Sequence, residues 1–189
     1  MGVDFEKARW DAASLLFSGA VWLISVYGSH QLFGSVQFGP ASFVLSVPAG
    51  LRLILLLVFR GWGAVGISLA EFLLVVIEGR HMAPADLVLH SALTGLAPYL
   101  ALRLTMAMFG IGENLTSIRS IHLPFLALAS SIGSAFLLTI EAAAVGRVSS
   151  GHLMGKMAAM LWGNFMGILC VFFLTYLLHT GWRMVNDAR

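Results

Sequence analysis

Two side chains of opposite charge, Arg52 and Glu71, each lie in the middle of a long apolar stretch. Arg60, Gly61 and Gly63 between them are typical of a tight turn. At 1.5 Å per residue, Arg52 lies about 12 Å and Glu71 about 15 Å from that turn, so on two antiparallel helices they reach a similar depth. A solitary charge at such depth in a bilayer costs at least about 2.5 to 3.5 kcal/mol on insertion scales. We therefore expect Arg52 and Glu71 to form a buried pair that faces the interior of a helix bundle.

This buried pair has two interpretations that the sequence leaves open. As a functional site, either charge binds a small ligand, carries a proton or couples to a partner helix. As a structural clamp, the pair holds two helices together while the long Arg52 side chain reaches toward the membrane interface. Asn164, in the middle of the last apolar stretch, is placed to complete the same polar cluster or to make a hydrogen bond between helices.

A second set of ionisable side chains lies near the ends of the apolar stretches, on the outer side of the membrane if both termini are cytoplasmic. Its members are His30, His81, Asp86, His90, Glu141 and His152. Histidines and carboxylates that converge from several helices bind a divalent metal or respond to pH. No metal-ligand spacing recurs among them, so simple placement at the membrane interface is the alternative. Paired histidines can also hold haem, but nothing selects a pair, and the cofactor is left unknown.

The composition shows which elements must position these groups. Of the 189 residues, 59% are hydrophobic and 11% are charged, and the mean hydropathy is +0.89. Soluble domains do not reach these values, which excludes water-soluble folding. A transmembrane helix needs about 20 apolar residues. The sequence predicts one all-α, polytopic membrane domain over residues 1–189, a bundle of about six helices with spans at 12–30, 42–59, 62–77, 84–108, 123–144 and 152–179.

The positive charges indicate how these spans are oriented. With six spans, both termini lie on the same side of the membrane. If that side is the cytoplasm, the cytoplasmic segments carry Lys7, Arg9, Arg60, Arg103, Arg119, Arg183 and Arg189, and the outer segments carry Arg80, Arg147 and Lys156. This excess agrees with the positive-inside rule and predicts cytoplasmic termini. The basic residues are scattered along the chain, so membrane lipid, and not nucleic acid, is an expected partner.

Small residues recur at every fourth position on the last two spans. One stripe consists of Gly155, Ala159, Gly163 and Gly167, and the other of Ala127, Ser131, Ala135, Thr139 and Ala143. Residues four apart lie on one face of a helix, and small side chains there allow close helix packing in lipid. We expect the two stripes to face each other, or one of them to contact a partner protein.

None of the sequence signatures of soluble enzymes occurs in the chain. It has no phosphate-binding glycine loop, nucleophile elbow or zinc-protease motif, and no set of cysteine ligands. Cys170 is the only cysteine. We therefore expect that the protein is not an enzyme.

Two strings of residues resemble a known family. The early string comprises Val47-Pro48-Ala49-Gly50, an apolar run to Arg60, Gly66-Ile67, Leu69 and Phe72-Leu73. The late string is Trp162-Gly163-Asn164-Phe165-Met166-Gly167-Ile168-Leu169. Together they are similar to the early and late signatures of the first type of bacterial membrane-associated sensor domain, in which an Asp usually stands at the place of Asn164.

This resemblance implies a sensory input module in the bacterial inner membrane, normally joined to a cytoplasmic histidine kinase, diguanylate cyclase or phosphodiesterase. Because the chain contains no such output domain, we expect a sensor or accessory subunit that acts through a partner protein in trans, with a site around Arg52, Glu71 and Asn164. The segment after Trp182 or the small-residue stripe of the last span would contact the partner. Two alternatives remain: a small-molecule transporter or its substrate-binding subunit, and a structural subunit of a larger membrane complex.

Overall fold

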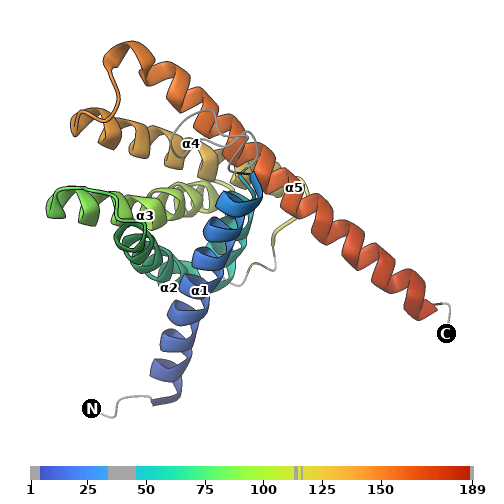
Figure 1. The fold of residues 1–189 in the computed structure, drawn as a ribbon. Helices are drawn as coiled ribbons and strands as arrows, with labels where there is room; N and C mark the ends of the chain where they lie inside the picture. The colour runs from blue at the N-terminus through green and yellow to red at the C-terminus, as the bar shows by residue number, and fades with distance from the viewer. Residues whose placement is uncertain (1–4, 34–45, 113–114, 116, 188–189) are drawn as a thin grey trace.

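The computed structural model describes residues 5–33, 46–112, 115 and 117–187 (Figure 1). Within these ranges the chain is helical and contains no strand, which confirms the all-α class. The long helices are α1 (Phe5–Phe33), α2 (Val47–Ile77), α3 (Pro84–Met108), α4 (His122–Ala144) and α5 (Leu153–Asp187), and the short 3₁₀ helix η2 covers Ser150–His152. All five long helices are long and apolar enough to cross a membrane, so the protein is a polytopic helical membrane protein.

The prediction of six spans was wrong, because the second and third expected spans belong to one helix. Helix α2 includes both, and within it only Arg60 has a non-helical conformation, with φ 53° and ψ −128°. One residue is enough to redirect the chain, so no loop separates the two segments. The expected beginning of the second span, at residue 42, lies outside the described residues.

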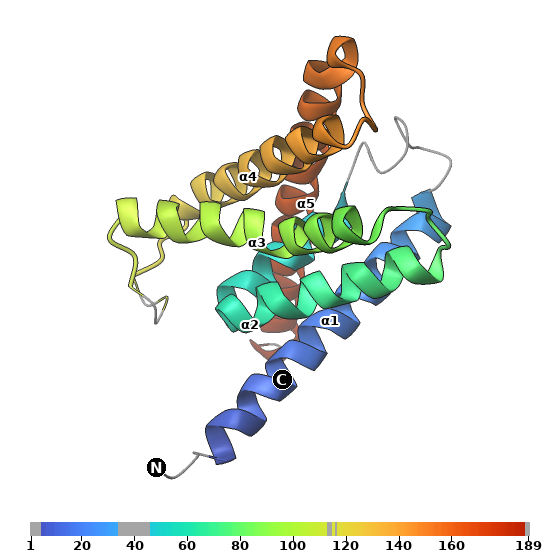
Figure 2. The same cartoon turned by 90° about the vertical axis from the view of Figure 1, so that its left-hand side faces the viewer.

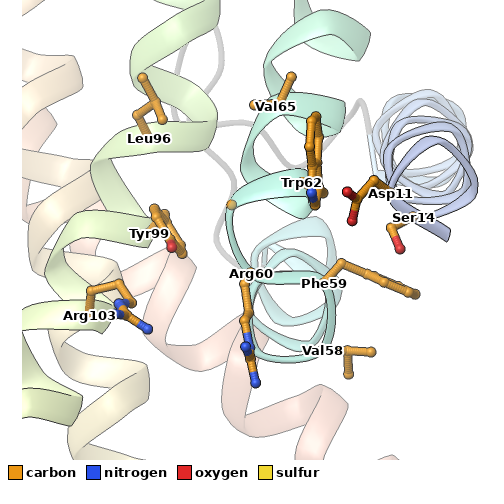
Figure 3. Close-up of a pocket in the computed structure, with 11 residues that line it drawn as sticks. Asp11, Ser14, Val58, Phe59, Arg60, Trp62, Val65, Leu96, Tyr99 and Arg103 are labelled. Atoms are coloured by element: carbon orange, nitrogen blue, oxygen red, sulfur yellow. The ribbon is translucent and has the colours of Figure 1, made fainter. Parts of the chain in front are cut away.

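The two segments of α2 fold back on each other at this break. A Cβ atom at Gly63 would lie 2.8 Å from the carbonyl oxygen of Leu55. In a continuous helix, eight residues would separate these positions by about 12 Å along the axis. Figure 3 shows the segment before Arg60 and the segment after it running in different directions. The turn expected at this place is therefore present, in the form of a break inside one helix.

Helix α2 lies at the centre of the fold. It packs against α1, α3 and α5 and also touches α4, whereas α3 packs against α4 and α4 against α5. The helices fan out instead of running parallel, and α5 crosses α3 steeply in both views (Figures 1 and 2). Leu53, Leu56 and Ile67, all from α2, are among the largest fully buried side chains.

Glycine lies at a close backbone approach in four of the packed pairs, α1–α2, α2–α3, α3–α4 and α2–α5. A Cβ atom would overlap or crowd backbone of the neighbouring helix at Gly66 against α1, Gly95 against α2, Gly133 against α3 and Gly167 against the Ser46 carbonyl. Helices in lipid gain little from burying apolar surface against each other, so this close backbone approach supplies much of the packing.

The predicted small-residue stripes are buried to different extents. On α4, Ala127, Ser131, Ala135 and Thr139 are at most 1% exposed. The backbone N–H of Ser46, the N-cap residue of α2, donates to the carbonyl oxygen of Gly163 on α5 at 3.0 Å, and Gly167 of α5 meets the same serine. Gly155 has nothing within 4 Å of a Cβ position. Gly163 and Gly167 of the α5 stripe thus pack against the start of α2, whereas no atom lies near Gly155, the first residue of the stripe.

The corrected number of helices also affects the orientation. Five helices that each cross once would place the termini on opposite sides of the membrane, whereas an α2 whose two segments each cross would keep them on the same side. Because the structure contains no membrane, cytoplasmic termini stay a prediction.

Candidate functional site

A chain of buried polar contacts connects four of the five long helices. We call Trp22 of α1, Arg52 and Glu71 of α2, His90 of α3 and Glu141 of α4 the buried polar network. Four of these residues are at most 7% exposed, and the His90 side chain is 17% exposed. The break at Arg60 brings Arg52 and Glu71 into the same network, because the two segments of α2 fold back on each other.

Glu71 lies between α1 and α3. Its Oε2 accepts a hydrogen bond from the indole Nε1–H of Trp22 at 2.9 Å, and its Oε1 is 3.7 Å from Nε2 of His90. A buried carboxylate is tolerated only when donors or opposite charges surround it. Trp22 and His90 provide these from two different helices.

His90 lies between two carboxylates. Its Nδ1 is 3.2 Å from Oε2 of Glu141, on the opposite edge of the ring from Glu71. A neutral imidazole donates from only one ring nitrogen, whereas the protonated ring donates from both. The protonation of His90 therefore decides whether the ring donates toward one carboxylate or toward both.

Glu141 connects this interior to the surface. Its Oε1 also forms an ion pair with Nη2 of Arg147, a residue in the connection after α4. The Glu141 side chain is 2% exposed and that of Arg147 is 36% exposed. The network consequently ends at a charged side chain that reaches solvent or lipid headgroups.

Arg52 is held by groups from α1, α3 and α4. Its Nη2 donates to Ser134 Oγ at 2.9 Å and its Nη1 to the Thr94 carbonyl oxygen at 3.3 Å. The guanidinium also lies 5.5 Å from the centre of the Trp22 ring, in cation–π geometry. The Arg52 Nε has no hydrogen-bond partner in the described part of the chain.

The expected contact between Arg52 and Glu71 is indirect. The two charges interact electrostatically, but no ion pair joins them among the described residues. The Trp22 indole lies between them, with its ring toward Arg52 and its N–H toward Glu71. Asn164 is 8% exposed, and its Nδ2 has no partner within residues 5–33, 46–112, 115 and 117–187. No hydrogen bond in those ranges links Asn164 to Arg52 or Glu71.

The weaker metal candidates lie in different places. His30 Nδ1 is 3.2 Å from Glu78 Oε1, and His152 Nδ1 is 2.8 Å from Ser149 Oγ. His81 is exposed and Asp86 is half-buried. Of the residues considered for metal or haem, His90 and Glu141 alone belong to the buried polar network. The described residues contain no group of three or more His, Cys, Asp or Glu placed to hold a metal ion.

The sequence reasoning missed the links that Trp22, Ser134 and Arg147 make. The contact of His90 with Glu71 was also not expected, although one signal for it was present: Glu71 lies seven residues before Glu78 and His90 seven residues after Ala83, so the two are equally far from the connection between α2 and α3. Counting residues from that connection places His90 at the same depth as Glu71. No comparable signal pointed to Trp22.

A scan against protein-family models and searches of curated proteins and of solved structures found no match to this chain.

Proposed function

We propose that the protein is a non-enzymatic sensor or accessory subunit of the bacterial inner membrane that acts through a partner protein in trans. In this proposal the buried polar network couples a signal to the packing of the helices. One observation carries it: His90 of α3 lies between the buried carboxylates of Glu71 on α2 and Glu141 on α4.

The charges of the network support a coupling role. Arg52 and Arg147 contribute two positive charges, and Glu71 and Glu141 two negative ones, so the sum is zero with neutral His90 and +1 when the ring is protonated. A hydrogen bond that involves a charged group contributes about 1.5 to 3 kcal/mol. That corresponds to roughly a 10- to 150-fold change in the ratio of two helix arrangements. A change in the protonation of the His90 ring therefore suffices to shift the equilibrium between two arrangements of α2, α3 and α4.

The C-terminal half of α5 provides a surface for the partner. It extends away from the other helices (Figure 1). Phe173, Leu178 and Trp182 on it are 61%, 75% and 71% exposed. Helix α5 contacts the start of α2 at Gly163 and Gly167. A change in this contact would alter the position of α5, and so would reach a partner helix that lies along the C-terminal half of α5.

Site-specific photo-crosslinking tests this proposal. With a photoreactive amino acid in place of Leu178, the wild-type chain in native membranes should crosslink to one defined partner. Glu71→Gln, which removes the charge between Trp22 and His90, should change the crosslinking yield several-fold at equal expression. Gly155→Ala is the matched control and should leave the yield unchanged, because a Cβ at this position meets nothing within 4 Å. Equal yields in all three chains, or a chain that remains functional without a partner, would contradict the proposal.

The broken helix α2 favours a second candidate, a small-molecule transporter or its substrate-binding subunit. Transporters often bind substrates where a membrane helix is interrupted. Uptake by vesicles that contain only this protein, abolished by Glu71→Gln, would support this candidate over the first.

A further inference from the structure

A cleft of about 680 Å³ opens where α1, the break in α2 and α3 meet (Figure 3). Its polar lining includes Arg60 at the break, Arg103 of α3 and Asp11 of α1. Three aromatic side chains, Phe59, Trp62 and Tyr99, line it as well. The buried polar network does not contribute to this lining, so the cleft is a separate feature.

Two guanidinium groups line the cleft. In the view of Figure 3, Arg103 and Tyr99 lie on the α3 side of the cleft, and Arg60 lies apart from them at the break in α2. The Tyr99 hydroxyl oxygen would lie 3.7 Å from a Cβ at Gly61, so it is close to the break. Each arginine also has a further interaction within the protein. A guanidinium has five N–H donors in a planar fork, which suits it to bind a phosphate in addition to one such contact.

The backbone of Arg60 is strained at the break in α2. With φ 53° and ψ −128°, Arg60 has a conformation that is strained for any residue with a Cβ and relaxed for glycine. Gly61 and Gly63 follow immediately, yet the strained position carries an arginine. Strain of this kind clusters at functional sites and persists where the surrounding structure holds the backbone in place. Here the side chain is the cation that lines the cleft.

The α1 side of the cleft has the opposite character. In the view of Figure 3, Asp11 and Trp62 are drawn on the α1 side of the cleft, away from Arg103. A carboxylate beside an indole ring suits a positively charged ammonium group, through charge and through cation–π attraction. The cleft therefore presents a phosphate-binding part and an ammonium-binding part.

The aromatic and basic lining is typical of the level of lipid headgroups. Tryptophan and tyrosine gather at membrane–water interfaces, and basic pockets between membrane helices bind phosphate-containing headgroups. We propose that this cleft binds a lipid with a phosphoethanolamine headgroup, with its phosphate on Arg60 and Arg103 and its ammonium group at Asp11 and Trp62. This proposal does not rest on the proposed function, because it concerns other residues and a different ligand.

Native mass spectrometry of the purified full chain tests the proposal with three probes: phosphatidylethanolamine, phosphatidylglycerol and soluble phosphoethanolamine. The wild-type chain should retain phosphatidylethanolamine more strongly than phosphatidylglycerol, which lacks the ammonium group. Soluble phosphoethanolamine at the same concentration should not displace the lipid. Displacement would show that the ligand is a soluble phosphate compound, and would overturn the assignment to a lipid.

Variants then identify the contacts. Arg103→Gln and Arg60→Gly should each weaken the retention of phosphatidylethanolamine roughly tenfold, because each removes a charge-assisted contact with phosphate. Glycine fits the backbone at position 60, so the second variant keeps the fold. Asp11→Asn should reduce the preference over phosphatidylglycerol. Arg119→Gln is the matched control, since Arg119 is exposed and lies outside the cleft lining. Equal retention by wild type, Arg60→Gly and Arg103→Gln would overturn the proposal.

Discussion

Replacing Trp22 by phenylalanine is the most direct test of the buried polar network. The change keeps an aromatic ring near the Arg52 guanidinium, now 5.5 Å from the indole centre, and removes the N–H that donates to Glu71 at 2.9 Å together with part of the buried ring. The Glu71 carboxylate, in a residue that is 7% exposed, would lose a donor that water cannot easily replace. We expect a loss of about 1.5 to 3 kcal/mol in the free energy of unfolding, the usual range for a hydrogen bond to a charged group.

A second substitution separates the two contacts of the indole. Trp22→Leu removes the ring as well, and the loss of the cation–π contact should add about 0.5 to 2 kcal/mol to the effect of Trp22→Phe. Trp62→Phe is the matched control. The Trp62 side chain is 45% exposed, so its replacement should change the free energy of unfolding by about 0.5 kcal/mol or less.

Thermal unfolding in detergent micelles provides the measurement. For a chain of this length, about 1 kcal/mol corresponds to a shift of about 2 to 4 °C in Tm, so Trp22→Phe should lower Tm by several degrees. If Trp22→Phe and Trp62→Phe had the same Tm, the hydrogen bond between Trp22 and Glu71 would contribute nothing. The idea that Trp22 links the two charges of α2 would then be refuted.

Three further results are expected. Gly167→Ala should destabilise the protein by about 1 to 3 kcal/mol in the same unfolding assay, because its Cβ would overlap the carbonyl of Ser46, the N-cap residue of α2. Gly155→Ala should be neutral or slightly stabilising, and equal effects of the two substitutions would contradict the packing of α5 against α2. A double-mutant cycle of His90→Gln and Glu141→Gln should give a coupling energy of about 0.5 to 3 kcal/mol, and strict additivity would show that the 3.2 Å contact is energetically silent. Arg60→Gly should stabilise the chain by about 1 kcal/mol, because glycine relaxes the strained backbone; a clear loss of stability would show that the arginine side chain holds the break together.

Depth along the helices could be predicted from the sequence. Counting residues from Arg60 placed Arg52 and Glu71 at comparable depth on two segments that fold back, and the structure buries both side chains in one network. The same counting, applied to the connection between α2 and α3, accounts for the contact of Glu71 with His90. Depth follows from a constant rise per residue, and therefore needs no knowledge of packing.

The rotation of each helix about its axis could not be predicted. Rotation decides which neighbour a side chain meets, and it depends on where backbones approach most closely. The close contacts of Gly66 with α1 and of Gly95 with α2 set these rotations. They direct Trp22 between the two charges of α2, so that an indole separates Arg52 from Glu71. A single sequence does not show which of its 20 glycines will meet which helix.

The break in α2 also affects the bilayer that surrounds the protein. At 1.5 Å per residue, the segments 47–59 and 61–77 are about 20 Å and 26 Å long. Both are shorter than the hydrocarbon thickness of a typical bilayer, about 30 Å. Short apolar segments are accommodated by local thinning of the bilayer. Lipids beside α2 should consequently be thinned and dip toward Arg60, and the protein should be enriched in thinner membrane regions.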